Sequence, residues 1–358
     1  MYDIIIIGAG VIGTSAAREL SRYDLDIALL EANYDVATGS SGANSAIVHA
    51  GYDCTPGTLM ARLNVKGNEM YEQTASELDV PFKRIGSMVI ALTDEDMDTL
   101  NVLLKNGRRN GVKGLELLNK KQALNMQPNL NPDILGALWA PTAGITCPYE
   151  MTIAMAENAV QNGVHIFLNT AVKNICKQGE IFKIQTSNGE FESKYIVNCA
   201  GVKSDLISKM AGADEFNIIP RKGEYCLYDK KLGDKVSCVI FQPPSKLGKG
   251  VLVTPTVDGN LLIGPNAVDI DNREDSSTTP EGLEYVFHKA LSSVPTLSRR
   301  DIIRTFSGIR AVSDTGDFIV GESQTLDGFF NAAGICSPGL SAAPAIGREI
   351  ADIVSGKV

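Results

Sequence analysis

The sequence predicts an α/β fold, α+β overall, with one parallel sheet and a second sheet that is mixed or antiparallel. Residues 2–7 form a continuous apolar run with four isoleucines, which is typical of a strand buried on both faces of a parallel sheet. Residues 218–264 instead contain one short strand pattern after another. The 358 residues suggest two domains or one large one. They include 34 glycines, most of them at the ends of apolar runs, where α/β proteins turn.

The composition is that of a globular protein with an acidic surface. Hydrophobic residues make up 44% of the chain and charged residues 21%, which is too apolar for a disordered chain. The net charge of −9 argues against binding to nucleic acid or to an anionic membrane surface. No apolar run approaches the about 20 residues of a membrane span. Met1–Asp3 has no basic segment of a secretory signal, so we expect a cytoplasmic protein, with peripheral membrane association left open.

The cysteines are scattered, and no two of them form a C-x-x-C pair. This spacing argues against structural zinc and cysteine-ligated iron–sulfur clusters, so we expect no metal site and reduced thiols. The seven cysteines are Cys54, Cys147, Cys176, Cys199, Cys226, Cys238 and Cys336.

The first elements form a βαβ unit. A helix is expected over residues 14–22 and a second buried strand over residues 25–30. A loop rich in Gly, Ser, Ala and Asn follows over residues 33–55. Long ordered loops are usually functional, so we expect this loop to belong to a site.

The rest of the chain alternates between expected helices and expected strands. Residues 266–280 are polar and are expected to form a surface loop. Helices are expected over residues 58–78, 94–111, 149–162, 204–211, 280–291 and 338–354. Strands are expected over residues 86–92, 172–186, 191–199, 223–228, 236–241, 250–255, 260–263, 302–311, 318–320 and 328–332.

Gly8, Gly10 and Gly13 match the pattern G-x-G-x-x-G between the first strand and the first helix. Gly8 permits the tight turn, Gly10 lets a pyrophosphate approach, and Gly13 lets helix and strand pack closely. The free N–H groups of this turn, including Val11 and Ile12, lie at the positive end of the helix dipole. The pattern therefore predicts a dinucleotide cofactor.

Glu31 ends the second strand and is followed by Ala32, which we also place in the cofactor site. A carboxylate at this point accepts both hydroxyls of an adenosine ribose and repels a 2′-phosphate, which argues against NADP. This unit alone does not separate FAD from NAD.

Three further segments favour FAD. They are residues 39–51, residues 196–201, and residues 316–334 with the helix that starts near Gly339. Together these segments resemble the D-amino-acid oxidase-like superfamily of FAD-dependent oxidoreductases. Residues 45–51, 221–225, 264–267 and 308–310 resemble its branch of L-2-hydroxyglutarate dehydrogenases/oxidases and glycerol-3-phosphate dehydrogenases.

The resemblance covers essentially the whole chain and implies a glutathione-reductase-type, Rossmann-like FAD domain with an inserted substrate domain. The FAD domain is expected over residues 1–80, 140–215 and 310–358, and the substrate domain over residues 81–139 and 216–309. Some relatives carry a further cysteine-rich domain, which we expect this chain to lack. Electrons would then pass from flavin directly to an external acceptor, which is a quinone, a redox protein or oxygen.

The resemblance also implies the cofactor contacts. The last helix is expected to point its N-terminus at the flavin pyrimidine, where N–H groups stabilise the reduced form. The expected FAD-binding residues are Gly8, Gly10, Val11, Ile12, Gly13, Glu31, Ala32, Ser40, Ser41, Asn44, Ser45, Val172, Ala200, Gly201, Gly308, Gly339, Leu340 and Ser341.

Oxidation of a secondary alcohol needs a base for the hydroxyl proton and fixed cations for an anionic substrate. His49 matches the family's position near the flavin and is expected to be the catalytic base, with a structural hydrogen-bonding role as the alternative. Arg310 ends a Gly-Ile-Arg motif and is expected to be catalytic by pairing with a substrate carboxylate or phosphate. Arg221, Tyr225 and Thr254 are further expected substrate-binding residues.

We therefore expect an FAD-dependent dehydrogenase or oxidase that transfers hydride from a small anionic hydroxy compound to flavin N5. An L-2-hydroxyglutarate-like 2-hydroxy acid is the first candidate substrate. The alternatives are, in order, an sn-glycerol-3-phosphate dehydrogenase, a glycine-oxidase-like amine oxidase and a flavin-binding electron-transfer subunit. Residues 250–255 lack the histidine that we associate with the hydroxyglutarate branch. An NAD-dependent dehydrogenase leaves the C-terminal flavin-type segment unexplained.

Overall fold

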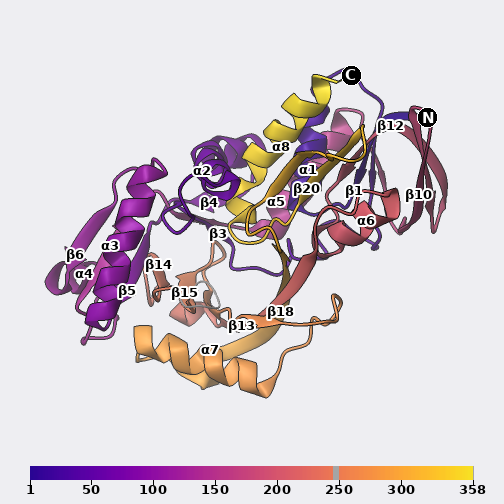
Figure 1. The fold of residues 1–358 in the computed structure, drawn as a ribbon. Coiled ribbons are helices and arrows are strands. Elements are labelled where there is room, and N and C mark those ends of the chain that lie inside the picture. The colour runs from indigo at the N-terminus through magenta and orange to yellow at the C-terminus, as the bar shows by residue number, and fades with distance from the viewer. Residues whose placement is uncertain (245–249, 358) are drawn as a thin grey trace.

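Two large sheets, each covered by helices, dominate the computed structural model, which describes residues 1–244 and 250–357 (Figure 1). Within these residues, no helix is both long enough and apolar enough to cross a membrane.

The first sheet has eight strands, in the order β10-β11-β12-β1-β2-β9, with β20 paired to β12 and β19 to β20. The central strand β1 pairs in parallel with both β2 and β12. Its side chains alternate between two cores, because Ile4 and Ile6 pack on one face and Ile5 and Ile7 on the other. The strands are β1 (Tyr2–Ile7), β2 (Ile27–Leu30), β9 (His165–Phe167), β10 (Val172–Gln178), β11 (Ile181–Thr186), β12 (Gly189–Asn198), β19 (Ile319–Glu322) and β20 (Phe329–Ala333).

Four helices lie together in the upper part of Figure 1, namely α1 (Val11–Leu20), α2 (Leu59–Glu77), α5 (Pro148–Gln161) and α8 (Gly339–Ser355). Glycines allow α8 to approach its neighbours closely. A Cβ at Gly67 of α2 would lie 2.1 Å from the Ser341 carbonyl oxygen, and one at Gly347 of α8 would lie 2.3 Å from Ser15 Oγ of α1. A single short helix, α6 (Ser204–Ala211), packs on the opposite face of the sheet.

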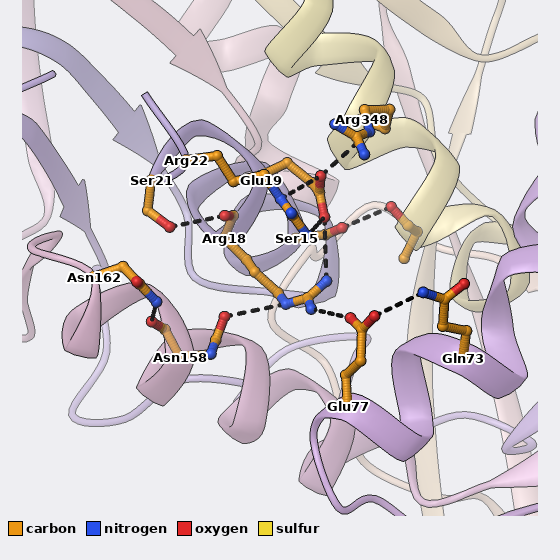
Figure 2. A network of polar contacts seen from close by, with 11 residues as sticks. Ser15, Arg18, Glu19, Ser21, Arg22, Gln73, Glu77, Asn158, Asn162 and Arg348 are labelled. Carbon is orange, nitrogen blue, oxygen red and sulfur yellow. Dashed lines mark hydrogen bonds and ion pairs between the residues drawn. The ribbon is translucent and has the colours of Figure 1, made fainter. Parts of the chain in front are cut away.

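Figure 2 shows a polar network that joins these four helices. Arg18 of α1 is buried, and its guanidinium donates to Asn158 of α5 at 3.2 Å and to Glu77 of α2 at 2.6 Å. The neighbouring Glu19 pairs with Arg348 of α8 at 3.4 Å. Because a buried guanidinium without partners is costly, this network favours one arrangement of the four helices.

The second sheet has nine strands, in the order β17-β13-β16-β15-β14-β5-β7-β6, with β18 paired to β13. Its pairs are antiparallel except for β14 and β5, which makes the sheet mixed. The long strands β13 and β18 also contact the 3-10 helix η1 (Gly201–Lys203), which follows β12 of the first sheet. The strands are β5 (Ser87–Ala91), β6 (Glu116–Asn119), β7 (Gly136–Ala140), β13 (Ile218–Tyr228), β14 (Val239–Phe241), β15 (Leu252–Pro255), β16 (Leu261–Gly264), β17 (Val268–Asp269) and β18 (Ile302–Ser313).

Helices cover the second sheet as well. They are α3 (Asp94–Arg109), α4 (Lys120–Met126) and α7 (Pro280–Ser293), and α7 runs beneath β13 at the bottom of Figure 1. The 3-10 helices are η1 (Gly201–Lys203), η2 (Lys230–Leu232) and η3 (Arg299–Asp301).

A small third sheet joins distant segments. In it, β8 (Gly144–Thr146) pairs with both β3 (Ile47–Val48) and β4 (Phe82–Lys83). This pairing fixes the end of the Gly- and Ser-rich loop that begins at residue 33.

The predicted fold class is confirmed. The predicted helices and strands are present with shifted ends, except that the strand expected over residues 172–186 is two antiparallel strands, β10 and β11. The expected loop over residues 266–280 contains strand β17, which was not predicted because two residues carry no periodicity. Strands β3, β4, β6, β7 and β8 and helix α4 were also missed. We propose that the two large sheets mark the FAD domain (residues 1–80, 140–215 and 310–358) and the substrate domain (residues 81–139 and 216–309).

Candidate active site

The turn between β1 and α1 is formed by glycines that no larger residue can replace. Gly8 has φ +103°, and a Cβ there would lie 2.6 Å from the Cys199 carbonyl oxygen and 3.1 Å from the Cα of Ala200. A Cβ at Gly13 would lie 1.9 Å from the Gly8 carbonyl oxygen. The start of α1 therefore lies directly over the ends of β1 and β12.

This helix start offers free backbone donors. The amide of Val11 donates to Ser41 Oγ at 2.9 Å. In the part of the chain that the structure describes, the amides of Gly10, Ile12 and Gly13 have no hydrogen-bond acceptor. Three N–H groups at the positive end of a helix fit a pyrophosphate, so these residues are suited to hold a dinucleotide.

Glu31 has a second function beside the one expected of it. Its carboxylate accepts hydrogen bonds from the amides of Ala9 at 2.8 Å and Asn33 at 2.9 Å, so it braces the glycine turn. Its carbonyl accepts the Thr170 amide at 2.7 Å, which brings the start of β10 at Val172 to the same edge. Contact of Glu31 with a ribose stays a prediction.

The loop after β2 packs against the second sheet. The Ser40 hydroxyl donates to the Ile309 carbonyl of β18, and a Cβ at Gly308 would lie 1.8 Å from the Ala43 carbonyl oxygen. Asn44 Nδ2 donates back to the Ser40 carbonyl at 3.1 Å. The cofactor side of the molecule therefore touches the strand that carries Arg310.

His49 is buried where several elements meet. Its backbone amide donates to Ser341 Oγ of α8 at 2.7 Å, and its carbonyl accepts Asn68 Nδ2 of α2 at 2.9 Å. On the ring, Nε2 lies 3.4 Å from Ser337 Oγ, and Phe241 of β14 lies 5.6 Å away between centroids. These contacts fix both the backbone and the ring plane, as a catalytic side chain requires.

The N-terminus of α8 is the second helix end at the site. The Gly339 amide donates to the Cys336 carbonyl, and the Ala342 amide donates to the Pro338 carbonyl at 3.1 Å. Among the described residues, nothing accepts from the intervening amides of Leu340 and Ser341. They fit the pyrimidine edge of a flavin, where negative charge develops on reduction.

Arg310 of β18 lies opposite Arg221 of β13. Its Nη2 donates to the carbonyls of Asn266 at 2.6 Å and Lys222 at 3.4 Å. Gly223 makes room for it, because a Cβ there would lie 2.8 Å from Nη2. Its Nε is buried and has no partner among the described residues.

The three cations of this region differ in how their charge is balanced. Arg221 pairs with Asp269 of β17, with Nη2 and Oδ2 3.0 Å apart. Lys222 pairs with Asp275 at 2.8 Å, and this hydrogen bond, together with two from Ser277, lowers the pKa of the Asp275 carboxyl to about 2. Within residues 1–244 and 250–357, Arg310 has no such carboxylate partner. Its charge is therefore available to an anion.

Tyr225 and Thr254 are both buried, in different surroundings. Tyr225 stacks on Phe306 at 4.8 Å between centroids. Burial raises the pKa of its hydroxyl, while Arg310 and a hydrogen bond with Ser45 act in the opposite direction, so Tyr225 links these two residues. The Thr254 hydroxyl donates to the neighbouring Pro255 carbonyl at 3.0 Å, and no described hydrogen bond joins it to His49 or Arg310.

The remaining expected residues lie at the edges of the site or outside it. Gly201 has φ +55° just after Ala200, and Ala32 is exposed beside Glu31. The other two histidines lie apart, since His165 is in β9 and His288 pairs with Glu284 on the surface of α7.

Sequence reasoning missed Asn68, Ser337 and Phe241 around His49, and Asn266 beside Arg310. Asn266 lies in the segment 264–267 that carried part of the family resemblance, so the sequence offered a signal for placing it in the site. Asn68 lies within a helix, where nothing in the local pattern marks its side chain.

Comparison with known proteins fits this geometry. The family described as "FAD dependent oxidoreductase" matches residues 3–353. The glycerol 3-phosphate dehydrogenase of Caloramator mitchellensis is 52% identical over 354 residues, covering 99% of this chain and 74% of that protein. The L-2-hydroxyglutarate dehydrogenase of Escherichia coli strain K12 is 32% identical over 281 residues, covering 76% of this chain and 66% of that protein.

A solved structure shows the same arrangement. The dithionite-reduced L-α-glycerophosphate oxidase of Mycoplasma pneumoniae, with FAD bound, superposes with a TM-score of 0.95 at 32% identity, covering 99% of this chain and 94% of that one. The expected resemblance and the expected cofactor are thereby confirmed. The glycine turn, the two open helix ends and the matching relatives show that the chain belongs to the family of FAD-dependent oxidoreductases.

Proposed function

We propose that this FAD-dependent oxidoreductase oxidises the secondary hydroxyl of sn-glycerol 3-phosphate. The observation that carries the proposal is Arg310, a half-buried cation without a carboxylate partner among the described residues, on a strand that touches the loop leading to His49. The sequence placed an L-2-hydroxyglutarate-like acid first. The 52% identity to a glycerol 3-phosphate dehydrogenase favours the alternative instead.

Arg310 holds the anionic end of the substrate. A guanidinium offers parallel N–H donors that match phosphate oxygens, and the buried Nε is free to be one of them. Removal of water around the guanidinium strengthens its attraction for the phosphate. Arg310 acts electrostatically on the buried Tyr225 hydroxyl, which also forms a hydrogen bond with Ser45 of the loop that leads to His49.

His49 accepts the hydroxyl proton at its ring nitrogen Nε2. The ring is held by Phe241 and faces Ser337, while Ser341 and Asn68 fix its backbone from two helices. A base held in this way contributes by position as much as by basicity. When FAD is bound, it supplies the acceptor of the hydride at N5. The amides of Leu340 and Ser341 favour the negative charge that this adds at the pyrimidine edge.

An external acceptor must then take the electrons, and a quinone, a redox protein and oxygen all remain candidates. The relatives include one named a dehydrogenase and one named an oxidase. Oxygen consumption during turnover, compared with reduction of an added quinone analogue, tests which class of acceptor is used.

Anaerobic mixing of the holoenzyme with single substrates tests the proposed function. We expect sn-glycerol 3-phosphate to bleach the visible absorbance of the oxidised flavin faster than L-2-hydroxyglutarate or glycine does. Faster bleaching by L-2-hydroxyglutarate would instead favour a 2-hydroxy acid as the substrate, as the sequence analysis first expected. Bleaching by none of the three would contradict the proposal and favour an electron-transfer subunit.

A further inference from the structure

A buried carboxylate on β13 is joined to Arg310 through Asn266 and does not pair with Arg310 directly among the described residues. Glu224 of β13 is 1% exposed, and its oxygens accept hydrogen bonds from the Thr279 amide at 2.8 Å and from the Thr279 hydroxyl at 3.0 Å. Thr279 is the N-cap of α7, so the carboxylate lies at the positive end of that helix. Gly282 leaves space for it, because a Cβ there would lie 1.4 Å from Glu224 Oε2. The charge of Glu224 is therefore compensated by α7.

Asn266 connects this carboxylate to Arg310. Its Oδ1 accepts the Glu224 amide at 2.8 Å, and its Nδ2 donates to Glu224 Oε2 at 3.0 Å. Its backbone carbonyl accepts Arg310 Nη2 at 2.6 Å. Two side-chain bonds to one residue thus fix the carbonyl that orients the guanidinium.

We propose that Asn266 and Glu224 are positioning residues, which hold Arg310 in the orientation that binds the anionic group of the substrate. The identity of the substrate rests on the proposed function, whereas the positioning of Arg310 can be tested with any phosphate anion. A carbonyl orients a guanidinium without cancelling its charge, whereas a carboxylate in direct contact cancels it, as Asp269 does for Arg221. The helix end at α7 allows Glu224 to act through Asn266 instead.

A double-mutant cycle on the holoenzyme tests this chain of contacts. The variants are Asn266→Ala, Arg310→Met and the two combined. Inorganic phosphate is the probe, and its binding is measured as a change in the absorbance of the bound flavin. We expect Asn266→Ala alone to raise the phosphate Kd by about 10-fold, as for loss of a bond to a charged group. In the Arg310→Met background it should change the Kd by less than about two-fold, since the guanidinium it positions is gone.

The same cycle is read in turnover with sn-glycerol 3-phosphate. Asn266→Ala should raise KM more than it lowers kcat, because the anion contact is made before and during the reaction. Glu224→Gln preserves the shape of the side chain and one acceptor oxygen. It therefore tests the inference even if Asn266→Ala does not fold. It should weaken phosphate binding by a smaller factor, about three-fold.

Glu284→Gln is the matched control, because it removes an exposed carboxylate of α7 that pairs with His288 and Arg299, outside this chain of contacts. We expect its phosphate Kd to stay at the wild-type value. Equal effects of Asn266→Ala in both backgrounds, or an effect of Glu284→Gln as large as that of Asn266→Ala, would overturn the positioning role. So would a wild-type enzyme that binds no phosphate. If phosphate binds and the Kd values of the variants follow the expected cycle, but sn-glycerol 3-phosphate is not oxidised, only the proposed function is contradicted. If sn-glycerol 3-phosphate is oxidised, but the effects of the Asn266 and Arg310 substitutions are additive, only this inference is contradicted.

Discussion

The two sides of the site manage charge by different means. On the expected cofactor side, several backbone amides at the starts of α1 and α8 have no acceptor among the described residues, and Gly8 and Gly13 let α1 pack closely on the strand ends. On the substrate side, the charge belongs to one side chain, Arg310, which is oriented by carbonyls of other residues. The first arrangement is inseparable from the fold, whereas the second can be altered while the fold remains. Substitutions on the two sides should therefore fail in different ways.

The largest effect is expected from Gly13→Ala. Its Cβ would lie 1.9 Å from the Gly8 carbonyl oxygen, so the helix must move away from the turn. We expect a loss of about 3 kcal/mol of unfolding free energy together with loss of bound FAD. Thermal unfolding and the flavin-to-protein ratio measure both. Gly39→Ala is the control, since nothing lies within 4 Å of its Cβ position. A stable Gly13→Ala protein with full FAD content would contradict the claim that the cofactor side is inseparable from the fold.

His49→Gln should have the next largest effect, a slower reduction of the flavin in a protein that still binds FAD. Removal of a general base lowers the rate of flavin reduction by about 10²-fold or more. Stopped-flow absorbance under anaerobic conditions measures this rate, with His288→Gln as the control on the exposed face of α7. An unchanged rate in His49→Gln would leave His49 with the structural role that was the alternative.

Arg310→Met should lower kcat/KM for sn-glycerol 3-phosphate by about 100-fold, because a charged bidentate contact is lost. Arg221→Met should lower it by much less, since the charge of Arg221 is already balanced by Asp269. Steady-state kinetics of both variants, with FAD content confirmed, sharpen the contrast between the sides. A larger effect of Arg221→Met would mean that the substrate anion displaces Asp269.

The smallest effect concerns pH. The hydrogen bond from Lys222, with two further hydrogen bonds from Ser277, lowers the pKa of the Asp275 carboxyl from 3.8 to about 2. A folded-state pKa below the unfolded one gives stability that is present above the unfolded pKa and lost as pH falls through the folded pKa. The stability difference between wild type and Asp275→Asn should therefore be constant above about pH 4 and shrink toward about pH 2. Chemical denaturation at several pH values measures it, and a difference that grows on acidification would contradict it.

The sequence was informative where function depends on local backbone geometry. The glycine turn and the last helix could be predicted, because each requires particular small residues at neighbouring positions. The short strand β8 could not, since its partners at residues 47–48 and 82–83 are remote and three residues show no periodicity. For the same reason, Asn266 gained its role only through contacts with Glu224 and Arg310 on other strands.

The choice of substrate lay beyond the sequence for a chemical reason. An arginine at the position of Arg310 pairs equally well with a carboxylate and with a phosphate. The motif therefore predicted an anion and left the identity of its acidic group open, which the comparison with relatives then narrowed.

The close contact between α1 and α8 has a consequence for cofactor exchange. The start of α1 is suited to the pyrophosphate and the start of α8 to the flavin ring, yet Ser15 of α1 donates to the Ala343 carbonyl of α8 at 2.8 Å, and Gly347 packs against the same serine. The helix ends expected to hold the pyrophosphate and the flavin ring are thus fixed relative to each other by direct contact. A substitution that shifts α8 away from α1 should therefore weaken both cofactor contacts together and speed the exchange of the cofactor.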